Sequence, residues 1–293
     1  MRKWSAISVA LAAVLIYNAS GQDSHWSGLN QDGLWASPNN WNPAGVPSSS
    51  VDANVWLDSA NGSSVITITH GEVESPGSGS SDMIYGPEFG AGLNIYGTLN
   101  WRYYLAPVQN DPTHPSIINL FNGSAVSGEG MALGDTWWYS GGPYATLNLY
   151  GSALANINYL YWGGRVNLYG GILSIASGLT VETVDAVSDA TRSMNLAGGE
   201  LLLPGSFTVT VNNWISRGIL LAYGKAQDTS DILIDETAIP GRTRVTTVPL
   251  GGSLQDIHLG LFPTNVTVGT SQTLTVLGDY PNVQNAVLTA LDP

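Results

Sequence analysis

The phrase Leu147-Asn148-Leu149-Tyr150-Gly151 returns nineteen residues later as Val166-Asn167-Leu168-Tyr169-Gly170. The same pattern occurs three more times, around Asn94, Asn119 and Asn195. Successive asparagines are separated by 25, 29, 19 and 28 residues. A repeat of this length, built of short strand-like runs without a helical pattern, is typical of one coil of a β-solenoid.

Each phrase alternates apolar and polar residues and then, in most copies, reaches glycine. Alternation with a period of two predicts a half-buried strand, and the glycine predicts a turn. We expect the aliphatic residues to stack inward, in coils about 4.8 Å apart. Leu154, Leu173 and Leu201 each follow their asparagine by six residues, which predicts equivalent positions in successive coils. Two outer ladders are predicted, one of Asn94, Asn119, Asn148, Asn167 and Asn195, the other of Tyr96, Phe121, Tyr150 and Tyr169.

The predicted fold is all-β, a right-handed parallel β-helix; a β-sandwich or jelly roll is the alternative, because strands of this length suit it too. Four segments are expected: a signal peptide (1–21), a Trp-rich N-terminal cap (22–60), solenoid repeats (61–250) and a C-terminal β cap or assembly segment (251–293). Within the third segment, 208–211 is predicted as a strand and 212–217 as a helical turn.

The first 21 residues have the features of a secretory signal. Arg2 and Lys3 form a basic start, an apolar run follows, and Ala19-Ser20-Gly21 offers small residues for cleavage before Gln22. The apolar run is shorter than the roughly 20 residues of a membrane span. We therefore expect export to the cell exterior or cell surface, with no membrane span after cleavage.

The composition excludes some partners. The net charge is −13, and only 11% of the residues are charged, so nucleic acids and anionic membranes are poor partners. With no cysteine, the chain has neither disulfides nor a thiolate site. Its polarity comes from Asn, Ser, Thr and Gly, and a neutral, hydrogen-bonding surface of this kind suits sugars, other proteins or further copies of the chain.

Tryptophans are concentrated near the start of the expected mature chain, at Trp26, Trp35, Trp41 and Trp56. Large aromatic side chains can cover the exposed core of a first coil, which favours a solenoid cap. A platform for stacking sugars is the alternative.

These tryptophan motifs, Trp26-Ser27-Gly28, Gly33-Leu34-Trp35, Asn40-Trp41 and Gly45-Val46-Pro47, resemble the opening of secreted planctomycete and verrucomicrobial autotransporter-like β-helix proteins, often associated with PEP-CTERM signals. The repeats from Asn94 to Asn195 and the stretch from Asn213 to Gly224 resemble the same family. The resemblance implies a solenoid fold and secretion. Because Asp292-Pro293 is not preceded by the sorting helix and basic tail of that family, anchoring by that route is not expected.

No catalytic constellation stands out. Acidic residues in the repeat core do not recur at coil spacing, so no carboxylate pair for acid–base hydrolysis is expected. Asp135 is the best single candidate, and a turn residue is the simpler explanation. The histidines His25, His70, His114 and His258 lack ligand spacing, and no metal or cofactor is expected.

A second cluster of aromatic residues is predicted to share one face of the solenoid, as a surface for a ligand or another subunit: Trp137, Trp138, Tyr159, Tyr161 and Trp162. Possible N-glycosylation sequons lie at Asn61, Asn122 and Asn265.

Three functions follow from these features. The first is a secreted, non-enzymatic structural or adhesive protein of the cell surface or extracellular matrix, which could assemble with itself into filaments, head to tail or laterally. The second is a carbohydrate-binding module for extracellular glycans, and the third is a polysaccharide lyase or hydrolase whose site the sequence does not reveal.

Overall fold

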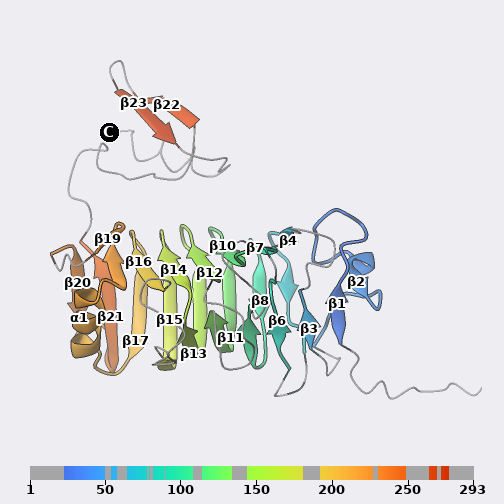
Figure 1. The fold of residues 1–293 in the computed structure, drawn as a ribbon, viewed down its shortest axis with the longest axis horizontal. Coiled ribbons are helices and arrows are strands. Elements are labelled where there is room, and N and C mark those ends of the chain that lie inside the picture. Colours follow the sequence, from blue (N-terminus) through green and yellow to red (C-terminus); the bar gives the residue numbers. More distant parts are fainter. Residues whose placement is uncertain are drawn as a thin grey trace, which may run out of the picture.

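The protein is represented by a computed structural model, which describes residues 23–49, 54–57, 65–77, 79, 82–88, 90–107, 114–133, 144–180, 192–226 and 230–248, together with the backbone of 264–268 and 272–276. The predicted all-β solenoid is confirmed: parallel coils stack into a β-solenoid of about six turns (Figure 1). The signal-peptide prediction lies outside the described residues.

One side of the solenoid is a sheet of short strands, which we call the Asn face. Its parallel strands follow one another in chain order, with one strand from each coil. They are β4 (Val65–Ile68), β7 (Gly92–Ile95), β10 (Ile117–Leu120), β12 (Thr146–Leu149), β14 (Arg165–Leu168), β16 (Ser193–Leu196) and β18 (Leu220–Ala222).

A second, larger sheet covers the other two sides. The long strands β11 (Ala125–Leu133), β13 (Leu154–Trp162) and β15 (Ile172–Thr180) pair with one another, and β17 (Glu200–Pro204) pairs with the first part of β15. The first part of β11 pairs with β8 (Thr98–Asn100), and its second part pairs with β9 (Tyr104–Ala106).

This division defines two further faces. The side that carries β5 (Val73–Glu74), β8 and the first halves of the long strands is the Ser face. The side that carries β1 (Ser24–Trp26), β3 (Val55–Trp56), β6 (Ile84–Tyr85), β9 and the second halves is the Tyr face. Each coil therefore passes from the Asn face to the Ser face and then to the Tyr face.

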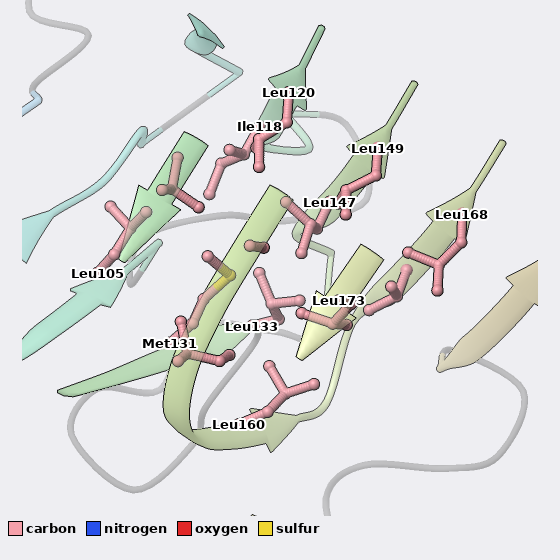
Figure 2. Close-up of a cluster of buried hydrophobic side chains, with 14 of the residues drawn as sticks. Leu105, Ile118, Leu120, Met131, Leu133, Leu147, Leu149, Leu160, Leu168 and Leu173 are labelled. Atoms are coloured by element: carbon pink, nitrogen blue, oxygen red, sulfur yellow. The ribbon is translucent and has the colours of Figure 1, made fainter. Parts of the chain in front are cut away.

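The repeated phrase sets the register of the Asn face. Asn94, Asn119, Asn148 and Asn167 are paired in that order across β7, β10, β12 and β14, and Asn195 follows on β16. The apolar residues on either side of each asparagine point inward and are fully buried. Figure 2 shows Leu147 and Leu149 directed toward Leu160 and Leu173 of the larger sheet.

The predicted equivalence of Leu154 with Leu173 is wrong. Leu154 pairs with Ile172, and it is Ala155 that pairs with Leu173 and occupies the core. The turn from Gly151 to Ala153 holds one more residue than the corresponding turn in the next coil. A shift of one residue moves a side chain to the opposite face of a strand, so Leu154 lies outside the core.

Aromatic packing covers the N-terminal end of the stack. Trp26, Trp35 and Trp41 are buried, and the rings of Trp26 and Trp35 meet that of Trp41 edge to face, with centroids 5.1 and 4.8 Å away. The indole of Trp41 donates a 2.8 Å hydrogen bond to the carbonyl of Trp35. A short 3-10 helix (Pro38–Asn40) leads into β2 (Trp41–Asn42), which pairs antiparallel with β1.

The C-terminal end carries helix α1 (Thr208–Ser216), not the predicted strand followed by a turn. Val211, Trp214 and Ile215 are buried, at the spacing of one helical face, whereas Val209 is 85% exposed. Packing against the last coil therefore outweighs the β preference of the Thr-Val-Thr-Val sequence.

The chain then reverses direction, so the predicted repeats do not extend to residue 250. Strand β19 (Lys225–Ala226) pairs antiparallel with β18, β21 (Arg242–Thr247) pairs antiparallel with β17, and β20 (Ile232–Asp235) pairs with β21. Further along, β22 (Thr264–Val268) and β23 (Gln272–Val276) form an antiparallel pair.

Candidate functional surface

The Asn ladder hydrogen-bonds coil to coil. The side-chain nitrogen of each asparagine donates to the side-chain oxygen of the preceding one, at 2.8 Å for Asn119 to Asn94, Asn148 to Asn119, and Asn167 to Asn148. Asn195 differs, because its side-chain oxygen accepts from the backbone N–H of Gly224. These amides are already engaged within the chain, which gives the ladder a stabilising role.

The aromatic ladder lies at the corner after the Asn face. Its rings stack nearly parallel, with centroids 4.3 Å apart for Tyr96 and Phe121, 5.5 Å for Phe121 and Tyr150, and 5.2 Å for Tyr150 and Tyr169. Burial raises the pKa of Tyr150 to about 12. Each ring in the middle of the stack has a neighbouring ring against both of its faces, so it has no free face for a sugar.

The predicted aromatic surface is only partly formed by the residues named for it. Tyr159 and Tyr161 lie on the outer side of the Tyr face, with Tyr159 37% exposed. Trp137 and Trp138 lie outside the described residues.

The placement of Trp162 on that surface is wrong. Trp162 is fully buried, its indole donates to the carbonyl of Gly164 at 3.1 Å, and its ring meets Trp214 edge to face. The physical reason is that successive side chains of a strand point to opposite faces. Trp162 is two residues from the inward-pointing Leu160 and so also points inward, whereas Tyr159 and Tyr161 point outward.

Other aromatic residues, not predicted from the sequence, also lie on the Tyr face. Trp56 stacks on Tyr85 with centroids 4.0 Å apart and on His25 at 5.8 Å. Tyr104 meets Tyr103 and Tyr161 edge to face, at 4.4 and 5.6 Å. The sequence feature that could have predicted them is an aromatic residue next to an inward-pointing aliphatic residue in each short strand, as in Val55-Trp56, Ile84-Tyr85 and Tyr104-Leu105.

Two tyrosines of the Tyr face lie over glycines of the next coil. Tyr104 pairs with Gly130, which pairs with Tyr159, which pairs with Gly178. A Cβ added to Gly130 would overlap the Tyr104 ring, and one added to Gly178 would lie 3.3 Å from the Tyr159 ring. The absent side chains leave room for the rings to cover the neighbouring strand, so tyrosine and glycine alternate along this row.

A polar pair lies beside this row, where β11 and β13 bend from the Ser face to the Tyr face. The Asn158 amide donates a 2.6 Å hydrogen bond to the Glu129 carboxylate. Burial raises the pKa of Tyr104, and its contacts with Tyr161 add to the effect. The pair and the two tyrosines together form a surface of partly exposed rings and hydrogen-bonding groups.

A second polar row on the Ser face also went unpredicted. The Ser127 hydroxyl donates to the Asn100 side-chain oxygen at 2.6 Å, and the Asn100 amide donates to the Ser75 hydroxyl at 3.3 Å. Asn156 and Ser174 continue the row in register. Because Asn and Ser alternate there, no repeated residue type marked it in the sequence.

Of the predicted sequons, Asn122 lies exposed in the turn after β10, and its side-chain oxygen accepts from the hydroxyl and backbone N–H of Ser152. Asn265 lies on β22, and Asn61 lies outside the described residues. Among the residues that the structure describes, no group of three or more His, Asp and Glu side chains could hold a metal ion. Within that same part, no helix is long and apolar enough to cross a membrane.

Comparisons with protein-family models, with curated proteins and with solved structures found no match. The function must therefore be inferred from the chain's own residues, and above all from those of the Tyr face.

Proposed function

We propose that the protein is a secreted, non-enzymatic adhesive element of the cell surface or extracellular matrix, which holds an extracellular glycan through its Tyr face. The observation that carries this proposal is the row of Tyr104 and Tyr159, partly exposed aromatic rings on a rigid β-sheet beside the polar pair Glu129 and Asn158. Aromatic surfaces with a few hydrogen-bonding groups are typical of binding sites.

The signal-like start of the sequence supports export, and the low charge supports a partner that is recognised by stacking and hydrogen bonds. The stacked ladders support a rigid scaffold, since hydrogen bonds and ring contacts link each coil to the next. Binding residues held on a rigid sheet lose little conformational entropy on binding.

The test is retention on the polysaccharide-containing matrix of the producing culture. We expect the parent protein to be retained and the Tyr159→Ala variant to be released in the wash. Tyr169→Ala is the matched control, because it removes one tyrosine from the aromatic ladder at a different corner of the coil. Equal retention of all three proteins would refute the proposal.

A second candidate function, assembly into filaments, is favoured by strand β20. Within the described chain β20 pairs with β21 on one side only, and Leu233 on this strand is 47% exposed. An edge strand presents backbone groups to which a second copy can pair. Strand β20 is the last strand of its sheet, at the C-terminal end of the coil stack, so we propose end-to-end assembly through this edge rather than lateral assembly. Electron microscopy of concentrated native protein would refute it by showing only single rods.

A further inference from the structure

Resting on the proposed function, we further propose which glycan the Tyr face takes. We infer that it binds a neutral, extended β-linked polysaccharide chain that lies along the solenoid axis, with Tyr104 and Tyr159 stacking on every second sugar. Glu129 and Asn158 accept hydrogen bonds from the hydroxyl groups of that chain.

The spacing of the two rings determines the direction of the ligand. Tyr104 and Tyr159 occupy the same row two coils apart, with Gly130 between them. Neighbouring strands are ~4.8 Å apart, which puts the two rings roughly 9.6 Å apart along the axis. A ribbon-like β-linked chain presents the same side of every second sugar, about two sugar lengths apart, whereas an α-linked helical chain curves away.

The glycines determine how the rings lie. Because Gly130 and Gly178 have no side chain, the rings of Tyr104 and Tyr159 lie over their backbone. One side of each ring covers the sheet, and we infer that a sugar stacks on the opposite side, which Tyr104 shares with its edge-to-face contacts to Tyr103 and Tyr161. Tyr159 is 37% exposed and Tyr104 is half-buried, as expected for rings that use one side for packing.

The polar pair supplies the hydrogen bonds between the two stacking positions. The pairing of Gly128 with Ile157 and of Gly130 with Tyr159 brings Glu129 opposite Asn158. The hydrogen bond between them uses one carboxylate oxygen of Glu129 and the amide nitrogen of Asn158. The second carboxylate oxygen and the amide oxygen remain as acceptors, and sugar hydroxyls are suitable donors.

Charge narrows the class of glycan further. The chain carries a net charge of −13, and the acceptor at the centre of the surface is a carboxylate. An acidic polysaccharide would be repelled by both. A neutral polysaccharide is not repelled in this way, and its hydroxyl groups can donate hydrogen bonds to the Glu129 carboxylate.

The experiment is isothermal titration of the purified full chain with cellohexaose, chitohexaose and mannohexaose, with maltohexaose and polygalacturonate as controls. We expect at least one of the three β-linked hexasaccharides to bind and neither control to bind. We expect Tyr104→Ala and Tyr159→Ala each to weaken that binding by on the order of tenfold. Tyr169→Ala should bind as the parent does.

Two glycine variants test the ring position without deleting a tyrosine, in case Tyr104→Ala does not fold. Gly130→Ala places a Cβ where the Tyr104 ring lies and should weaken binding, because the ring must move. Gly178→Ala, whose added Cβ would displace the Tyr159 ring by only a few tenths of an ångström, is the matched control and should weaken binding less. Equal effects of the two variants would overturn the assigned ring geometry.

The failures of the two proposals are distinguishable. If no β-linked hexasaccharide binds while retention on the matrix still depends on Tyr159, the assigned glycan class is wrong and the adhesive function stands. If maltohexaose binds as well as the β-linked chains, the extended geometry is wrong. If retention on the matrix does not depend on Tyr159, both proposals are wrong.

Discussion

Asn148 shows how much one polar side chain does in this molecule. Its nitrogen donates to Asn119 and its oxygen accepts from Asn167, while the residue itself is only 8% exposed. A buried amide without partners is destabilising, so its two partners are what allow an asparagine to occupy this position. Asn94, the first of the hydrogen-bonded asparagines, makes only one of these bonds.

We therefore predict that Asn148→Ala lowers the free energy of unfolding by about 1–3 kcal/mol, the net worth of two hydrogen bonds. Asn94→Ala, which removes one, should have about half that effect. The measurement is urea denaturation followed by circular dichroism. Equal losses in the two variants would contradict the role of the ladder.

For single residues, the sequence predicts which positions are equivalent in successive coils better than it predicts which way their side chains point. The repeated asparagines and tyrosines could be aligned by their neighbours, because the same phrase recurs. Trp162 could not be placed by its aromatic character, since only its parity with Leu160 determines that it points inward. Leu154 was misplaced by a one-residue difference in turn length, which no local property of Leu154 reveals.

At the level of elements, helix α1 begins with an unusual cap. Its N-cap residue, Phe207, has no side chain that can accept a hydrogen bond. Instead the carboxylate of Glu236, distant in sequence, accepts from the backbone N–H of Thr208 at 3.1 Å and from the hydroxyls of Thr208 and Ser206 at 2.7 Å. A sequence search for local caps could not find this helix, because its cap comes from elsewhere in the chain.

This cap predicts an acid-sensitive element. The hydroxyls of Thr208 and Ser206, with the Thr208 backbone N–H, lower the pKa of Glu236 from 4.5 to about 2. A carboxyl whose folded-state pKa is lowered stabilises the fold above its unfolded pKa and loses that contribution as the pH falls through the folded value. We expect the thermal midpoint to fall between about pH 5 and pH 2, and to fall less in Glu236→Gln. Parallel pH profiles would contradict the cap.

The strands predicted from the repeated phrase were largely correct, because the alternation of apolar and polar residues that marks a strand depends only on neighbouring residues. The segment after Gly224 was expected to continue the solenoid repeats, but its strands pair antiparallel. The direction of a strand depends on its partner in the folded structure. Strand β21 pairs with the free edge of β17 after the chain has reversed, so it runs antiparallel to β17. A salt bridge between Arg244 and Glu200, at 2.7 Å, joins the two paired strands.

On the scale of the whole molecule, aromatic side chains cover both ends of the core. Trp26, Trp35 and Trp41 cover the first coil, and Trp214 of α1 packs on Trp162 at the other end, with centroids 5.5 Å apart. A solenoid without such covers would expose the aliphatic interior of its last coil. The concentration of tryptophans near residue 26 was visible in the sequence, whereas Trp214 lay within a segment misassigned as a turn.

We predict that Trp214→Ala lowers the free energy of unfolding by about 3–5 kcal/mol, as is usual when a large buried aromatic residue is removed. The loss should be felt first at the C-terminal end. Hydrogen exchange should accelerate in β16, β17 and β18 before it accelerates in β7. Uniform acceleration along the chain would show that the solenoid unfolds as one unit.

The coils described above are unequal in length but equal in rise. Successive coils hold 25, 29 and 19 residues between hydrogen-bonded asparagines, yet each adds one strand to the Asn face. If the two ends of the solenoid are pulled apart, each coil that detaches releases a different length of slack. At about 3.3–3.6 Å per residue, the shortest releases ~65 Å and the longest ~100 Å. A solenoid that unfolds coil by coil in this way would lengthen under load in discrete steps of unequal size.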